Sequence, residues 1–284
     1  MITTRTARTA AVGLLLCTSF AALGCGTTGS AGTGSSEAAP ETPVRFSYAP
    51  FDATYLIASH TSQEQDFGGQ VNASEFAMHW YLSVVNSASE LTLTVDSAPK
   101  ITGVAQGVSQ TDLDQAAGLV FTGTLSPEGR ISDFAGGDAS SDFTQQLAQS
   151  VERFLPRVPA GGAAAGQAWV DTLETTTGSG GLEINVQLIT RSQADSWMEH
   201  EGGQALLVTT TTDYSMSGGG TQMGSEIDID GTGVRHSTLY LGADGLFLRG
   251  ISADTANLTA TVAAMGAIIP IFQTRHDTVA AVAR

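Results

Sequence analysis

The chain has 284 residues, with 12 basic and 28 acidic side chains, so its formal net charge at neutral pH is −16. So acidic a surface repels phosphate backbones, which argues against nucleic acid as a partner, and it gives no electrostatic attraction to anionic lipid. The length allows one large all-β domain or two small domains, with a core that needs no cross-links.

The N-terminus has the layout of an export signal. Arg5 and Arg8 supply positive charge, and no acidic residue appears before Glu37. The apolar stretch at residues 10–23 is too short and too interrupted by Thr and Ser for a membrane span, which needs about 20 apolar residues. The stretch ends in the tetrapeptide Ala22-Leu23-Gly24-Cys25.

This tetrapeptide resembles the lipobox of bacterial lipoproteins, in which a small residue precedes the cysteine. The resemblance implies cleavage between Gly24 and Cys25 and a diacylglyceryl thioether on the Cys25 sulfur. The sequence departs from the pattern at Ala22, where larger aliphatic residues are commoner. The alternative is an ordinary secretory signal that is cut near Ala22.

The lipobox resemblance divides the chain into a signal peptide at 1–24, a flexible Gly/Ser/Thr/Pro tether at 25–43 and a β-rich domain at 44–284. We expect the mature protein to lie in the bacterial cell envelope, anchored to a membrane through acylated Cys25, and to face the periplasm or the cell exterior. Because Cys17 falls within the signal, we expect no disulfide, zinc cluster or catalytic thiol.

From residue 44 onward, apolar residues recur at every second position. The clearest runs are 76–84, 91–95 and 182–188, and the Thr-rich run 208–212 also suits a strand. This alternation predicts strands with one buried and one solvated face, and therefore a mainly β fold with an antiparallel sheet, shaped as a half-barrel or a sandwich.

Three hairpin turns are expected between these strands. Each is a short run of Gly, Pro, Asp or Ser between flanks of alternating apolar residues, and the three lie at 126–129, 177–181 and 242–245.

One amphipathic helix is predicted at 141–155. The residues Ser140, Ser141 and Asp142 are candidate N-caps, and an apolar stripe with three-to-four spacing follows, made of Phe143, Leu147, Val151, Phe154 and Leu155. Pro156 then ends the helix. We expect residues 161–166 to be an Ala/Gly linker and Trp169 to open the next strand.

The end of this helix resembles a sequence motif found in uncharacterised exported β-rich bacterial lipoproteins. The matching residues are Phe154-Leu155-Pro156, Val158-Pro159 and Gly166-Gln167-Ala168-Trp169, within 141–177, and Ala163, Ala164 and Ala165 depart from the pattern. The resemblance implies a fold in which the helix ends at the proline and the chain re-enters the sheet at the tryptophan. It implies no activity.

Catalytic and metal motifs are not found in the sequence. None of the five histidines lies at helical ligand spacing from another, and no nucleophile elbow or phosphate loop occurs. Glu226, Asp228 and Asp230 could offer oxygen ligands to calcium, but alternating acids are typical of a solvated strand face. Asp112 and Asp114 are interpreted as a loop or a helix start. We therefore predict no enzyme, no cofactor and no metal site.

Two functions remain open. In the first, the concave sheet holds an apolar ligand or lipid beneath the helix, with Phe143, Leu147 and Trp197 as candidate contacts. Trp197 is expected in a polar loop, and the sheet positions beneath the helix are expected to include Leu182, Ile184 and Val186. In the second, the protein has a structural or protein-interaction role without a small ligand. A carrier keeps an unfilled apolar cavity, whereas a scaffold fills it.

Overall fold

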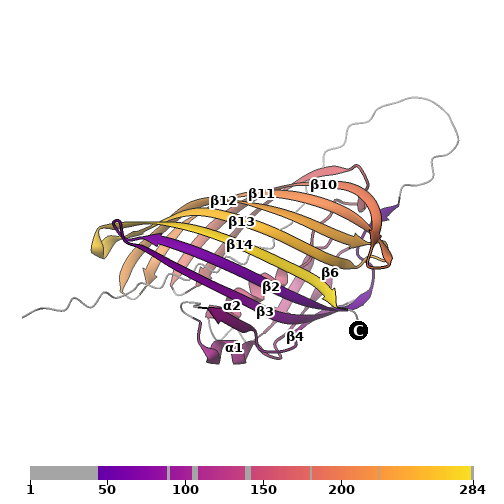
Figure 1. Ribbon diagram of the computed structural model, residues 1–284. Helices are drawn as coiled ribbons and strands as arrows, with labels where there is room; N and C mark the ends of the chain where they lie inside the picture. Colours follow the sequence, from indigo (N-terminus) through magenta and orange to yellow (C-terminus); the bar gives the residue numbers. More distant parts are fainter. Residues whose placement is uncertain are drawn as a thin grey trace, which may run out of the picture.

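The computed structural model describes residues 44–87, 90–103, 108–137, 142–179, 181–222 and 224–282, and these are mainly β-strand (Figure 1). The long strands are β2 Phe51–Asp66, β3 Val71–Asn86, β9 Ala168–Ser179, β10 Leu182–His200, β11 Gly203–Gln222, β12 Ser225–Gly242, β13 Phe247–Val262 and β14 Ala267–Val282. The short strands are β1 Arg45–Phe46, β4 Leu91–Val95, β5 Lys100–Gly103, β6 Val120–Leu125, β7 Ile131–Gly136 and β8 Ala163–Ala164.

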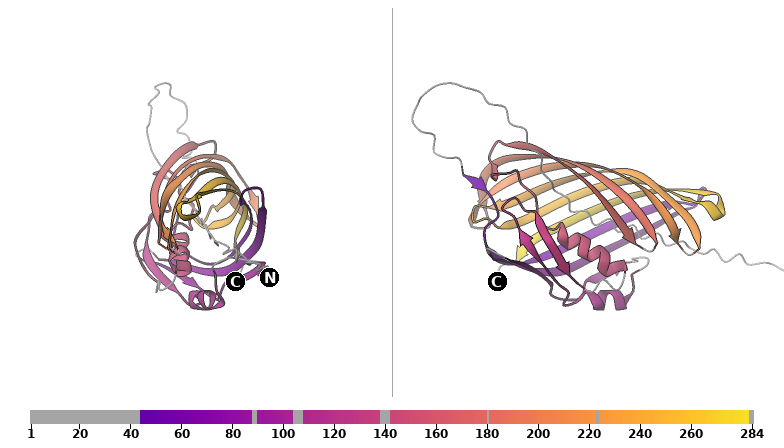
Figure 2. Two further views of the ribbon diagram at one scale, coloured as in Figure 1. Left: turned by 90° about the vertical axis from the view of Figure 1, so that its left-hand side faces the viewer. Right: turned by 180° about the vertical axis from the view of Figure 1, so that it is seen from behind.

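Twelve of these strands form one antiparallel sheet in the order β7-β6-β4-β3-β2-β14-β13-β12-β11-β10-β9, with β5 paired to β3. The sheet is not closed, because β7 and β9 are its two edges. It curves strongly around an interior, as the end-on view in Figure 2 shows. The predicted mainly β antiparallel fold is thus confirmed as one curved sheet, and the sandwich alternative is wrong.

The alternation of side chains explains why these segments form strands. On β10, Ile184, Val186 and Leu188 are buried on the concave face, whereas the residues between them, such as Glu183 and Asn185, are exposed on the convex face. Two of the three predicted turns are confirmed, since the turn at 242–245 joins β12 to β13 and the turn at 126–129 joins β6 to β7. The third is misplaced, because residues 177–179 still belong to β9.

The described chain contains two α-helices and a short 3-10 helix, η1 Ala263–Met265, so the predicted helix is present and is accompanied by a further one. The additional helix, α1 Gln110–Ala116, begins with a capping box in which Ser109 and Asp112 bond to each other's backbone N–H. None of the described helices combines the length and the hydropathy that a membrane crossing requires.

Helix α2, Asp142–Glu152, is shorter than the predicted 141–155. Ser140 and Ser141 lie outside the described residues. The helix lies on the inner side of the curved sheet (Figure 2), and its side chains reach the edge strand β9. There Thr177 donates a hydrogen bond to Gln149 at 2.7 Å, and Arg153 donates one to Thr175.

The segment after α2 is held by Tyr48 and by the turn between β6 and β7, where the Val158 N–H donates to the Glu128 carbonyl at 2.9 Å. Tyr48 donates a hydrogen bond to the Pro156 carbonyl at 2.8 Å. Gly129 has a φ of +84°, and a Cβ at this position would lie 2.4 Å from the same carbonyl oxygen, so the close approach requires glycine.

The predicted linker at 161–166 contains a strand, because β8 pairs with β1. The linker prediction is therefore wrong in part. Strand β9 then begins at Ala168, one residue before Trp169, and Trp169 is buried. The predicted entry into the sheet is confirmed to within one residue.

Two apolar clusters of buried side chains lie in the interior. The first contains Leu147, Val151 and Phe154 with residues of the sheet such as Leu82 and Leu206. The second lies farther along β10–β14 and contains Ile184, Val186, Ile227, Ile229, Leu258 and Ile271, with Leu182 packed against it. The expectation that Leu182, Ile184 and Val186 lie beneath the helix is therefore wrong, because α2 packs on the first cluster.

Candidate functional site: a cavity under helix α2

A cavity of about 170 Å³ lies between α2 and the inner face of the sheet. Its apolar side is formed by Phe143, Leu147 and Phe154 at the helix and by sheet residues that include Phe76, Met78 and Trp80. Leu147 and Phe154 are buried, whereas Phe143 is only partly buried. Two of the three sequence candidates for ligand contact, Phe143 and Leu147, are thus placed in one wall.

The other side of the cavity is polar. Three neighbouring rows of inward-facing residues cross the sheet between the two apolar clusters, and we call them the polar belt. In strand order from β11 to β2, the first row is Thr210, Ser237, Ser252, Asp277 and Ser59, the second is Thr212, Arg235, Asp254, Arg275 and Thr61, and the third includes Tyr214, Gln273 and Gln63.

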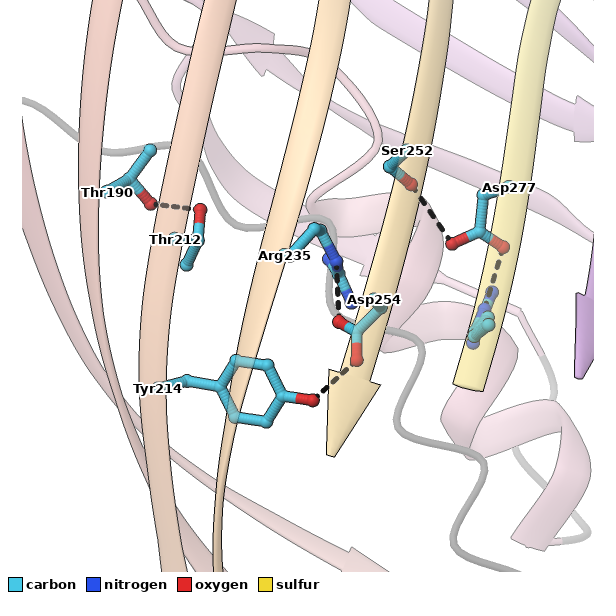
Figure 3. A network of polar contacts seen from close by, with 8 residues as sticks. Thr190, Thr212, Tyr214, Arg235, Ser252, Asp254 and Asp277 are labelled. Atoms are coloured by element: carbon cyan, nitrogen blue, oxygen red, sulfur yellow. Dashed lines mark hydrogen bonds and ion pairs between the residues drawn. The ribbon is translucent and has the colours of Figure 1, made fainter. Parts of the chain in front are cut away.

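Charges in the polar belt are paired with one another (Figure 3). Arg235 Nε donates to Asp254 Oδ2 at 2.9 Å, and the hydroxyl of Tyr214 donates to Asp254 Oδ1 at 2.6 Å. Arg275 Nε donates to Asp277 Oδ1 at 2.7 Å. Both pairs are largely buried, so each carboxylate faces a cation in a region of low dielectric, where an unpaired charge would be costly.

Hydroxyl groups extend this network along the belt. Thr190 and Thr212 share a hydrogen bond of 2.9 Å between β10 and β11, and Ser252 donates to Asp277 (Figure 3). Burial raises the pKa of the Tyr214 phenol well above its usual value, and the nearby Asp254 carboxylate raises it further. Tyr214 therefore remains a neutral hydrogen-bond donor at physiological pH.

Three buried polar atoms in the cavity wall have no hydrogen-bond partner among the described residues. They are Gln63 Nε2, Thr210 Oγ1 and Gln273 Oε1. Thr210 and Gln273 are 5% and 6% exposed, so solvent does not readily reach them. Because buried polar groups normally have a partner, these side chains are the ones in the cavity wall that a polar group of a ligand could satisfy.

Trp197 lies away from this cavity. It belongs to β10, opposite Leu206, and its indole Nε1 donates to the Val44 carbonyl at 3.4 Å. The prediction of a polar loop around Trp197 is therefore wrong, because the residue lies near the C-terminal end of β10 and bonds to the backbone just before β1. The pairing register shifts between Ala194 and Trp197, which explains why the local pattern does not resemble a strand.

The remaining sequence candidates fall outside the cavity. Asp228 and Asp230 are exposed on the convex face of β12, and His79 and His236 are exposed on strands. Among the residues that the structure describes, no group of three His, Cys, Asp or Glu side chains could hold a metal ion. Gly24 and Cys25 lie outside the described residues.

The polar belt was not found from the sequence, although a signal was present. On β14 the alternation Ile269, Ile271 continues as Gln273, Arg275 and Asp277, so polar side chains occupy positions that the apolar residues assign to the concave face. Polar residues that take the place of apolar ones on the buried face of a strand indicate a polar site inside the protein.

No family model and no curated protein matches the chain. Among solved structures, it is similar to OccK2 (OpdF) of Pseudomonas aeruginosa, with 8% identity and a TM-score of 0.24, over 82% of this chain and 98% of that chain. It is also similar to a loop-deletion mutant of OmpT, an outer membrane protein of Vibrio cholerae, with 7% identity and a TM-score of 0.20, over 80% and 99% of the two chains. A DUF1329 family protein from Desulfovibrio piger ATCC 29098 has 8% identity and a TM-score of 0.15, over 77% and 83%. Similarity at this level carries no inference about a ligand, partner or location.

Proposed function

We propose that the protein is a lipid-anchored, non-enzymatic binding protein of the bacterial cell envelope, which holds an apolar group in the cavity under α2. The cavity itself is the observation that carries this proposal. An apolar cavity of about 150 Å³ is large enough to bind benzene. Since pockets for whole drug-sized ligands measure about 300–1,000 Å³, this cavity suits a small apolar group or part of a longer chain.

The alternative is a structural or protein-interaction protein without a small ligand. Such a protein has no reason to leave space inside its sheet. The second apolar cluster is packed with large side chains such as Ile229 and Leu258, whereas the open volume adjoins α2 and the polar belt. This difference between the two ends of the interior favours a binding role.

A small uncharged probe, fluorobenzene, tests this proposal. We expect the protein to bind fluorobenzene, with the binding followed by fluorine NMR. The Ser237→Leu variant places a larger side chain in the cavity wall, so we expect its affinity to fall by at least about tenfold. The matched control is Thr238→Leu, which adds a similar side chain at the next position of β12, on the opposite face.

Two results together would overturn the proposal. The first is that fluorobenzene fails to bind the folded domain. The second is that native mass spectrometry of protein purified from its own envelope detects no bound small molecule. The structural or protein-interaction role would then replace the binding role.

A further inference from the structure

The polar belt constrains the charge of a ligand that the cavity can accept. Its two arginines already pair with two aspartates, Arg235 with Asp254 and Arg275 with Asp277, so the belt carries no surplus positive charge. Adding an anion would leave an uncompensated negative charge in a buried region of a protein whose net charge is −16. The charge balance therefore favours an uncharged ligand.

The unpartnered atoms indicate what that ligand should supply. Gln63 and Gln273 lie opposite each other in the pairing of β2 with β14. Gln63 Nε2 is a donor without an acceptor, and Gln273 Oε1 is an acceptor without a donor among the described residues. A hydroxyl group can satisfy both, since it accepts and donates at once.

We propose that the cavity binds an amphiphile whose head group carries uncharged hydroxyls. The head group lies on the polar belt against Gln63 and Gln273, and the apolar part lies against Phe143 and Leu147 of α2. This inference rests on the proposed binding function and adds the chemical class of the ligand.

The test compares two six-carbon probes, 1,2-hexanediol and hexanoate, by NMR titration of the folded domain. We expect the diol to bind more tightly than the carboxylate by about tenfold or more. In the double variant Gln63→Met/Gln273→Met, the preference for the diol over fluorobenzene should fall by about tenfold or more. The variant should melt at the same temperature or higher, because it removes two buried polar atoms that lack partners. Gln204→Met, at an exposed position of β11, is the control and should leave the preference unchanged.

Each outcome has a separate meaning. If hexanoate binds as tightly as the diol, or if the double variant keeps its preference for the diol, the inference about the head group is wrong while the binding function stands. If the diol fails to bind but fluorobenzene binds, the inference is also wrong. If neither fluorobenzene nor the diol binds, the proposed function fails and this inference fails with it.

Discussion

Asp254 joins two side chains of the polar belt, Arg235 and Tyr214 (Figure 3). It accepts hydrogen bonds from Arg235 and Tyr214 and is 7% exposed. Replacing it with alanine would leave a buried guanidinium and a buried phenol without their acceptor. We therefore expect Asp254→Ala to lower the free energy of unfolding by about 3–5 kcal/mol, measured by urea denaturation.

The matched control is Asp213, whose carboxylate pairs with Arg191 on the convex face. Both side chains are about half exposed, so water solvates the charges whether or not they meet. Asp213→Ala should therefore cost less than about 1 kcal/mol. Equal losses for the two variants would mean that the charges of the polar belt are hydrated rather than buried.

Helix α2 can be tested as an element of the core. Leu147 is 5% exposed and belongs to the first apolar cluster, so Leu147→Ala should lower the free energy of unfolding by about 2–5 kcal/mol. Gln145 is exposed on the same helix, so Gln145→Ala should cost clearly less than Leu147→Ala. A helix that acted as a loosely held lid would instead show little loss of stability at Leu147.

The strands could be predicted from the sequence, but their lengths could not. The apolar alternation of β10 is clear from Leu182 to Leu188 and then gives way to Thr190 and Ser192, which are also buried on the concave face. Because the polar belt interrupts the apolar stripe, the sequence pattern suggests that the strand ends soon after Leu188. In the structure β10 continues to His200.

Helix α1 was only one of two alternatives in the sequence, where Asp112 and Asp114 indicated a loop or a helix start. It has seven residues and buries only Leu113 and Ala116, which is too little to establish a helical period. Its one local signal is the pair Ser109 and Asp112 at capping-box spacing. The cavity itself could not be predicted, because it depends on how a short helix packs against residues from seven strands that lie elsewhere in the sequence.

We propose that the whole molecule is attached to the membrane through one atom, the sulfur of Cys25. The acidic chain offers little attraction to anionic lipid, so acyl chains on Cys25 would supply the anchor. We expect Cys25→Ser to move the protein from the membrane fraction to the soluble fraction, as measured by fractionation and immunoblotting. If the variant still fractionates with membranes and the parent protein incorporates no labelled fatty acid, the lipoprotein assignment is wrong.

Strand β2 is bordered by β3, its neighbour in sequence, and by β14, whose Val282 pairs with Thr54. Hairpins β10–β11, β12–β13 and β2–β3 can form locally, but the β2–β14 seam requires closure of a very long loop. We therefore expect this seam to form late and the domain to fold slowly. Until then, two partial sheets would each present an unpaired edge, so the period before the seam closes is when the protein is most exposed to aggregation.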